Sequence, residues 1–250
     1  PVALSCAPMA GVTSPITMAG TLVQTHAEQL AGIAICQMAN AGAPVLYGGI
    51  PGRANLWNLG YQGGSVECGM MNAAIHQLAD HIKVPNYNSS GLTDAKIPDA
   101  QAGWEKAMTT LLAAMGGSNY VHHAAGMLNC MITVAHEQFV IDDEIIGLCC
   151  KVLAGIPTDP ESLALEVIES AAQGEDFIKS AHTMKHMKTE YFIGNGVTVT
   201  KNWAKWINAG GLDARMRARN IDKNILTRAS GIYLADEVDA AIREKYDIRL

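Results

Sequence analysis

The sequence lacks the residue spacings that usually mark a metal centre or a disulfide framework. Its 6 cysteines form no C-x-x-C pair and are not interleaved with histidines. They predict small buried thiols in a reducing cytoplasm, and we expect no metal site and no disulfide. Charged residues are few, at 17% of the chain, and the formal net charge is −6 without a basic run. Arg215, Arg217 and Arg219 are predicted to form a solvated helix face, so nucleic acid is not an expected partner.

Long apolar runs and a leader segment are also missing. No uninterrupted apolar stretch approaches the ~20 residues that cross a bilayer, and no basic-then-apolar leader is present. A chain of 250 residues that is 49% hydrophobic can nevertheless bury a substantial core. We therefore expect a soluble cytoplasmic protein without membrane contact. The sequence begins at Pro1 inside a strand-like run, which indicates a fragment of a longer protein.

Several catalytic motifs have no counterpart. The chain contains no G-x-S-x-G, no H-E-x-x-H, no G-x-G-x-x-G and no Walker loop. These absences argue against the common hydrolase, metalloprotease and nucleotide-binding sites. They do not exclude enzymatic activity, because a nucleophile and its base need not be close in sequence.

The strongest positive signal is a strand-helix unit that occurs four times. Short apolar runs begin at Val2, Ala43, Val84 and Asn119, and each breaks into Gly, Pro, Asn or His before a long helical segment. This pattern predicts the α/β class and about four βα units, half of a TIM (β/α)8-type barrel. The barrel half is predicted to span 1–156. Short helical patterns alone follow, so 157–250 is predicted to be a helical C-terminal region that packs on the barrel.

The expected helices follow from apolar spacing and capping residues. Ser14, Ser65 and Thr133 are predicted N-caps, and Gly116 and Gly155 are predicted stops. The expected helical ranges are about 16–40, 65–82, 101–115 and 133–154, then 160–173, 175–190, 201–208, 213–229 and 235–246.

The candidate site residues are mostly neutral or aromatic, because barrel enzymes place their chemistry where strands end. An aromatic-walled cavity suits a quaternary ammonium ion, which cannot donate hydrogen bonds and is held by ring faces at about 0.5–2 kcal/mol each. The alternative is that the tyrosines simply fill the barrel interior. The candidates for substrate binding are Tyr47, Trp57, Asn86, Tyr87, Asn88 and His122.

Other polar groups receive a structural interpretation. His122 and His123 are adjacent and should point to opposite sides of a strand, which argues against a paired metal site. Either a single inward histidine that donates or transfers a proton, or a structural one, fits this position.

Asp142, Asp143 and Glu144 should fan around a helix, with at least two of them solvated or capping. Gln101 and Glu105 share a helical face and are near enough to the loop that contains Asp94 and Lys96 to help position it, and a surface pair is favoured over a catalytic role.

Six segments, in this order and spacing, resemble the trimethylamine methyltransferase family over essentially the whole chain. They are PMAGVTSPITMAG at 8–20, AEQLAG at 27–32, GAPVLYG at 42–48, TDAKIPDAQAGWEK at 93–106, VIDDEI at 140–145 and AHT at 181–183. The resemblance implies a TIM-type barrel that removes a methyl group from an amine nitrogen. The acceptor it implies is Co(I) of a cobalamin (corrinoid) carried by a separate cognate corrinoid protein, with no cofactor bound tightly to this chain.

The resemblance also limits the class of substrate that we expect. Family members are about twice as long, so the chain looks like their C-terminal half, and a homo-oligomer is expected. True trimethylamine enzymes carry pyrrolysine in a loop that corresponds approximately to Asp94, Lys96 and Ile97, where this sequence has ordinary residues. This departure favours the branch that resembles glycine betaine methyltransferases. The predicted substrate is therefore a quaternary amine, and no catalytic residue is assigned.

Three alternatives remain at this point. The first is a trimethylamine methyltransferase proper. The second is a non-catalytic half barrel that acts as a binding or scaffold protein and survives by oligomerising. The third is an unrelated barrel enzyme for a phosphorylated metabolite, although no Gly-rich phosphate loop supports it.

Overall fold

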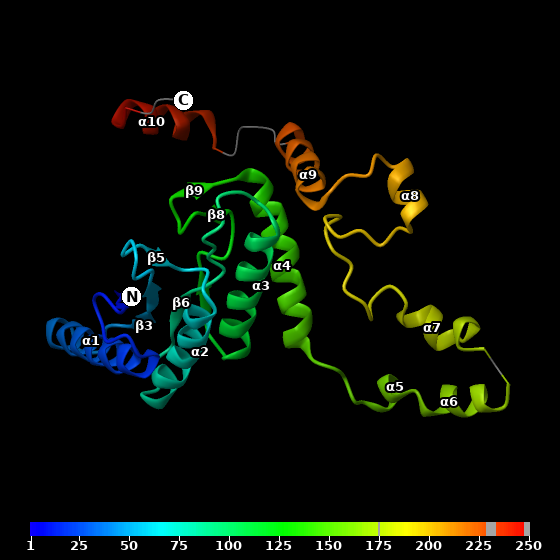
Figure 1. Cartoon of the computed structure of the whole chain (residues 1–250), viewed down its shortest axis with the longest axis horizontal. Helices are drawn as coiled ribbons and strands as arrows, with labels where there is room; N and C mark the ends of the chain where they lie inside the picture. Colours follow the sequence, from blue (N-terminus) through cyan, green and yellow to red (C-terminus); the bar gives the residue numbers. More distant parts are fainter. Residues whose placement is uncertain (175, 229–233, 248–250) are drawn as a thin grey trace.

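The computed structural model describes residues 1–174, 176–228 and 234–247, and strands alternate with helices over its first part (Figure 1). The repeating unit is a parallel strand followed by a long helix. Its members are β1 (Val2–Cys6), α1 (Met18–Ala39), β3 (Val45–Gly49), α2 (Val66–His81), β6 (Tyr87–Ser89), α3 (Ala100–Met115), β7 (Tyr120–His122) and α4 (His136–Ala154). The predicted α/β alternation is confirmed.

The four strands lie side by side in chain order. β1 pairs with β3 and β6 pairs with β7, both in parallel, and a parallel bridge between Tyr47 and Asn86 joins β3 to β6. The order is therefore β1-β3-β6-β7. Among the described residues these strands form an open sheet and do not close into a barrel.

Short strands extend the loops that follow the sheet. β2 (Met9–Ala10) pairs in parallel with β4 (Gly52–Ala54), and β4 pairs with β5 (Tyr61–Gln62) in antiparallel fashion. β8 (Met127–Leu128) and β9 (Thr133–Val134) form a hairpin. These pairings give the loops after β1, β3 and β7 a fixed shape.

Capping side chains define where the helices begin. Thr17, Ser65 and Asp99 each accept a hydrogen bond from the backbone N–H three residues on, at 3.3, 3.4 and 3.1 Å. The predicted cap at Ser65 is confirmed. The other two predicted caps are wrong: Ser14 bonds the Thr21 hydroxyl instead, and Thr133 lies in β9.

A buried ion pair joins α3 to α4. The Lys106 Nζ lies 3.1 Å from Asp142 Oδ2, and both side chains are at most 1% exposed. Burial lowers the pKa of Lys106 and raises that of Asp142 to about 6, in each case against the attraction of the partner. The expectation that at least two of Asp142, Asp143 and Glu144 are solvated or capping is wrong, because only Asp143 is exposed. Asp142 is buried against α3, and Glu144 is buried on another side of α4, where it accepts a hydrogen bond from the Asn195 backbone N–H at 2.7 Å.

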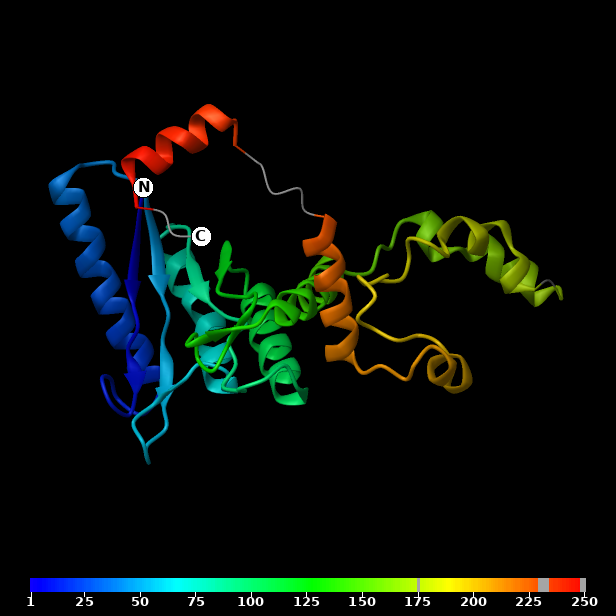
Figure 2. The same ribbon diagram turned by 90° about the horizontal axis from the view of Figure 1, so that it is seen from above.

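Short helices and irregular segments make up most of the rest of the described chain, and the predicted ranges 160–173 and 175–190 are each divided into shorter pieces. This part of the chain contains α5 (Pro160–Leu163), α6 (Leu165–Ala172), the 3-10 turn η1 (Phe177–Lys179), α7 (Ala181–His186), α8 (Trp203–Asn208), α9 (Ala214–Arg228) and α10 (Asp236–Lys245). The segment from α5 to α8 extends away from the sheet (Figures 1 and 2). α9 returns to α4, where Ala218 and Val140 share an apolar cluster.

The arginines of α9 are less solvated than predicted. Arg215 Nε donates to Glu137 at 3.2 Å, and Arg217 Nε donates to the Val197 carbonyl at 2.7 Å. Only Arg219 of the three is exposed. The prediction of a uniformly solvated face is wrong because α9 packs against α4 on the side that carries Arg215.

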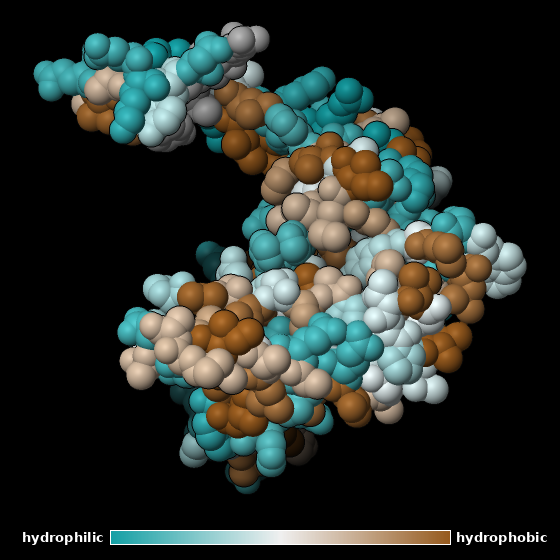
Figure 3. Space-filling model, turned by 90° about the vertical axis from the view of Figure 1, so that its left-hand side faces the viewer, coloured by the Kyte–Doolittle hydropathy of each residue, from teal (hydrophilic) through white to brown (hydrophobic). Residues whose placement is uncertain are grey.

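Apolar side chains also reach the outer surface of α1. Val23, Ile35 and Met38 are more than 60% exposed there. In Figure 3, where α1 is on the side nearest the viewer, apolar residues form brown patches on the lower body. No helix of the described residues is both long and apolar enough to cross a membrane.

Lys106→Met should lower the free energy of unfolding by about 3–5 kcal/mol, because it leaves the Asp142 carboxylate buried without its cation. The double variant Lys106→Met/Asp142→Asn should recover part of this loss, since the buried charge is then gone. Urea unfolding followed by circular dichroism gives both values. Arg243→Ala, which removes an exposed i,i+4 pair with Asp239, serves as the control and should leave stability nearly unchanged, because water screens such a pair. Equal losses in the single and double variants would contradict the pairing argument.

Candidate functional site

Three loops that follow strands of the sheet meet around one cavity of about 380 Å³. They are the loops after β3, β6 and β7, and the first and last of them contain the short strands β4, β5, β8 and β9. The cavity is lined by Asn55, Asn58, Gly60, Tyr61, Gln62, Asp94, Lys96, Asn129, Cys130 and Ile132. Because the carboxyl ends of parallel strands are where such folds place their ligands, this is the candidate functional site.

The loop after β6 is held by Glu105 of α3. Glu105 Oε2 accepts hydrogen bonds from the Thr93 hydroxyl at 2.6 Å and from the Asp94 backbone N–H at 2.8 Å. Gln101 donates to Glu105 Oε1 at 2.9 Å and steadies that carboxylate. The pair that the sequence suggested as a support for this loop therefore contacts it, directly through Glu105 and indirectly through Gln101.

Asp94 and Cys130 face each other in the cavity. The Cys130 thiol donates to Asp94 Oδ1 and lies 3.0 Å from the Tyr61 carbonyl. Burial and the neighbouring Asp94 raise the pKa of Cys130 to about 12. Burial also raises the pKa of Asp94 and that of the Tyr61 hydroxyl. These shifts favour the neutral form of each group, which is the form that a poorly hydrated cavity stabilises.

The segment that carries Cys130 has an unusual backbone. Asn129, Cys130 and Met131 have φ of 49°, 51° and 70°, a left-handed run of three residues with side chains. Each such residue costs roughly 1–2 kcal/mol relative to the right-handed conformation. Backbone bonds from Asn129 to the Ala95 carbonyl and from Cys130 to the Thr93 carbonyl, at 2.8 and 2.9 Å, hold the run against the β6 loop. Strain of this kind is often kept at functional sites.

A second group of side chains lies on β6 and β7. Tyr87, Tyr120 and His122 form a ring cluster with centroids 6.0–6.5 Å apart. Gly48 on β3 leaves space for it, because a Cβ there would lie 2.0 Å from Tyr87 Cε1. Since alternate residues of a strand share a face, these rings all lie on one side of the sheet.

The other predicted site residues of the strands lie on the opposite side, toward the helices. Tyr47 is fully buried against Ile75 and Ala79 of α2, and its hydroxyl lies 2.9 Å from His26 Nδ1 of α1. Asn86 bonds His76 at 2.9 Å and Asn88 bonds Ser118. The structure therefore brings Tyr87 and His122 together and separates both from Tyr47, Asn86 and Asn88.

Trp57 and Ile97 lie apart from both groups. Trp57 is 94% exposed and borders a different cavity, of about 360 Å³, together with Arg53 and Glu67. Ile97 is 49% exposed beside Lys96, whose Nζ donates to the Asp94 carbonyl at 2.6 Å. Of the three predicted loop residues, Asp94 and Lys96 line the cavity.

The expectation that His122 and His123 point to opposite sides is wrong. Their rings stack with centroids 3.5 Å apart. The reason is that β7 ends at His122, and His123 has φ of 67°, which breaks the alternation of a strand. His123 Nδ1 lies 2.8 Å from the Ser89 hydroxyl, and burial lowers the pKa of this imidazole.

Comparison with known proteins gives a consistent result. The family model "Trimethylamine methyltransferase (MTTB)" matches residues 1–249. The chain belongs to the trimethylamine methyltransferase family. A glycine betaine methyltransferase of Desulfitobacterium hafniense (strain Y51) is 35% identical over 237 residues, which are 94% of this chain and 49% of that protein.

Relatives named for trimethylamine are equally similar. The trimethylamine methyltransferase MttB of Desulfitobacterium hafniense (strain DSM 10664 / DCB-2) is 36% identical over 97% of this chain and 48% of its own length. MttB2 of Methanosarcina mazei is 37% identical over 90% of this chain and 45% of its own length. The chain thus spans about half the length of these curated relatives, and identity alone does not choose between the two substrates.

Two residues that the structure brings into these groups, Tyr120 and Cys130, were not predicted from the sequence. Tyr120 has a detectable signal, because it stands two positions before His122 and shares its face of β7. Cys130 has none, since its contact with Asp94 spans 36 positions and depends on the left-handed segment.

The Cys130 thiol should be alkylated slowly by iodoacetamide near neutral pH, because only the thiolate reacts and its pKa is raised to about 12. Asp94→Asn removes the adjacent negative charge, lowers this pKa and should speed alkylation of Cys130 at least several-fold. Peptide mass spectrometry over time measures both rates. The exposed Cys150 is the internal control and should not respond to Asp94→Asn. A Cys130 rate that stays the same in the variant would show that Asp94 does not control the thiol.

Proposed function

We propose that this chain is part of a corrinoid-dependent methyltransferase that takes a methyl group from a quaternary amine such as a betaine. The observation that carries the proposal is the ring cluster of Tyr87, Tyr120 and His122 on the side of the sheet that faces away from α1 and α2. Aromatic faces at these separations attract a cation that cannot donate hydrogen bonds. Membership of a family that includes a glycine betaine methyltransferase supports the same substrate class.

The pKa shifts of groups in the 380 Å³ cavity, and of His123 beside His122, agree with this chemistry. Cys130, Tyr61 and Asp94 have raised pKa values and His123 a lowered one, so each shift favours a neutral group. A quaternary nitrogen leaves as a neutral tertiary amine when it loses a methyl group. No proton has to be supplied to that leaving group, and the protein's task is to orient the N–methyl bond and exclude water.

The methyl acceptor is proposed to be Co(I) of a corrinoid on a separate protein, which makes it a second substrate and not a resident group. The three loops around the 380 Å³ cavity present their residues at one edge of the sheet, where such a protein could approach. The loop after β6, which corresponds to the pyrrolysine region, contains the standard amino acids Asp94, Lys96 and Ile97, and this supports the non-pyrrolysine branch.

We further propose that the open sheet β1-β3-β6-β7 is half of a TIM-type barrel. Four parallel strands in chain order, each followed by a helix, are the repeating pattern of that fold. The division at about residue 156 into a barrel half and a helical region, and a homo-oligomer, are part of the same proposal. The apolar outer face of α1 offers surface for such an assembly.

The proposal predicts that the protein at the length of its relatives methylates a reduced corrinoid protein with glycine betaine or a related quaternary amine, but not with trimethylamine. The absorption change from the cob(I)alamin to the methylcob(III)alamin form measures the reaction. Consumption of trimethylamine alone would assign the chain to the other branch. Absence of transfer from every amine, with a folded protein, would favour the binding or scaffold alternative.

A substitution on the ring cluster tests the cage directly. Tyr87→Leu should raise KM for the quaternary amine by about 2- to 30-fold, the equivalent of one ring face at about 0.5–2 kcal/mol. Tyr87→Phe keeps the ring and should stay close to the parent value. Tyr47→Phe, which removes the hydroxyl that contacts His26 on the helix side, is the matched control and should leave KM unchanged. Equal KM values for Tyr87→Leu and Tyr87→Phe would exclude Tyr87 from substrate binding.

A further inference from the structure

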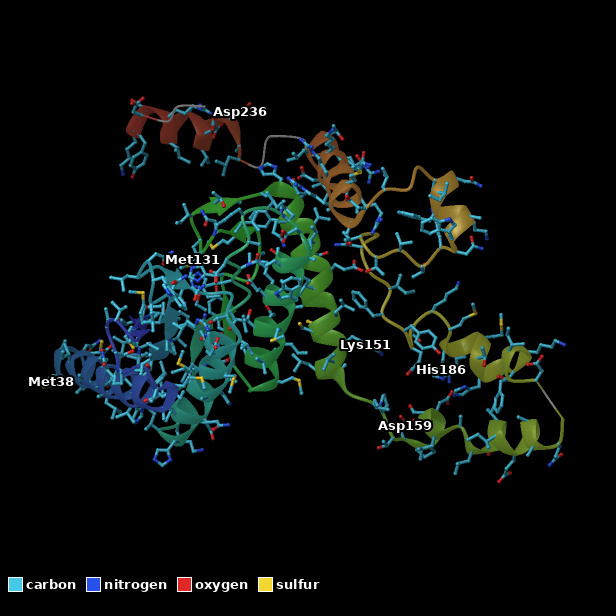
Figure 4. All side chains as sticks on the ribbon, in the orientation of Figure 1. Met38, Met131, Lys151, Asp159, His186 and Asp236 are labelled. Carbon is cyan, nitrogen blue, oxygen red and sulfur yellow. The ribbon has the colours of Figure 1, made fainter. Side chains whose placement is uncertain are left out.

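Two histidines and a glutamate meet between α5 and α7, outside the site described above. His182 and His186 are four residues apart on α7, so they share one helical face, and their ring centroids are 4.4 Å apart. Glu161 of α5 completes the group, and one ligand atom from each of the three side chains lies within 4.8 Å of the others. Figure 4 labels His186 on α7 close to Asp159, which caps α5.

We propose that Glu161, His182 and His186 form a binding site for a divalent metal ion of the zinc class. Two imidazole nitrogens and one carboxylate oxygen are a donor set that Zn²⁺ and Co²⁺ accept, with water in the remaining position. A zinc ion with bonds of ~2.0–2.1 Å needs its ligand atoms about 3.3 Å apart. His186 Nε2 and Glu161 Oε1 are already 3.1 Å apart, and His182 Nε2 lies 3.1 Å from the Glu161 carbonyl oxygen. Rotation of the His182 side chain would bring its ring nitrogen close enough to serve as the third ligand.

The surroundings of the group favour a cation. A cavity of about 860 Å³ adjoins it and is lined by His182, Asp159, Glu161 and Glu166 among apolar residues; the Lys185 ammonium, which contacts Glu161, is not part of this lining. Three carboxylates around one opening give it a negative potential. The cavity also leaves room for the water molecules that complete the coordination of the ion.

Lys185 is the competitor for this site. Its Nζ lies 2.6 Å from Glu161 Oε1, the same oxygen that contacts His186. Both side chains of the pair are exposed, at 62% and 48%. An exposed pair of this kind shifts an equilibrium by at most about fivefold, which a metal ion bound by two histidines readily exceeds. The Lys185 ammonium group therefore occupies the Glu161 carboxylate when no metal ion is bound, and the ion displaces it on binding.

Bound metal would link α5 to α7. α7 is six residues long and α5 is four, so neither is stable alone in water. A shared ion fixes both to each other through side chains. The inference stands independently of methyl transfer, since it uses no residue of the ring cluster or of the 380 Å³ cavity.

Titration of the protein with Co²⁺ alone tests the site. We expect one saturable site per chain, with visible d–d bands and without the thiolate charge-transfer band that cysteine ligands produce. His182→Ala and His186→Ala should each weaken Co²⁺ binding roughly tenfold or more, because each removes a ligand. His136→Ala is the matched control, because His136 is an exposed histidine on α4 outside this group, and it should bind Co²⁺ as the parent does.

A gain in affinity separates ligation from unfolding. Lys185→Met removes the competing ammonium group and should tighten Co²⁺ binding by up to about fivefold. A misfolded variant does not bind more tightly. Absence of saturable binding, an unchanged site in the His182→Ala/His186→Ala double variant, or weaker binding in Lys185→Met would each overturn the proposal.

Discussion

The interaction on which the rest of the site depends is the buried pair between Lys106 and Asp142. The Lys106 ammonium donates to the Gly91 and Met127 carbonyls, at 2.5 and 3.2 Å, and reaches Asp142 with its third proton. Asp142 in turn accepts from the Gly126 backbone N–H at 2.7 Å. The pair therefore ties α3 and α4 to the two segments that continue into the cavity, since Gly91 precedes Asp94 and Met127 precedes Cys130. Burial of both charges is costly, and a complete set of hydrogen bonds is what makes it tolerable.

The alternation of strands and helices was predictable because it rests on local signals. Apolar runs, Gly and Pro breaks and capping residues place α2 and α3 within two residues of their expected bounds. The predictions that fail depend on contacts between distant segments. Thr133 is a good capping residue by composition, yet the β8–β9 hairpin takes it into a strand. Asp142 looks like a surface carboxylate until Lys106, 36 positions away, is placed opposite it. Nothing in the sequence indicates that α3 and α4 pack along these faces.

The candidate site was predictable only in part, for a geometrical reason. Strand ends identify which residues are near the chemistry, but the face of a strand depends on its register. Tyr47 and Tyr87 are equivalent by composition, and only the pairing of β3 with β6 places them on opposite sides. The alternation of side chains along a strand does not apply to His123, because β7 ends one residue earlier, at His122. The family resemblance supplied the reaction class, which local pattern alone did not, since neutral side chains carry no catalytic motif.

The causes of the pKa shifts near the cavity bear on the kind of chemistry that its groups can perform. If the substrate needed a protein acid or base, at least one group near the cavity should have a pKa displaced toward neutral pH by a specific charged partner. Burial is instead the largest cause of the shifts at Cys130, Tyr61, Asp94 and His123, and it moves Cys130 and Tyr61 further from neutral pH. A substrate that carries a permanent charge requires no proton transfer, and its attraction to aromatic rings increases as water is removed. For the function proposed above, this means that a quaternary ammonium substrate would depend on the ring faces of Tyr87, Tyr120 and His122 for its attraction and not on proton transfer by these groups.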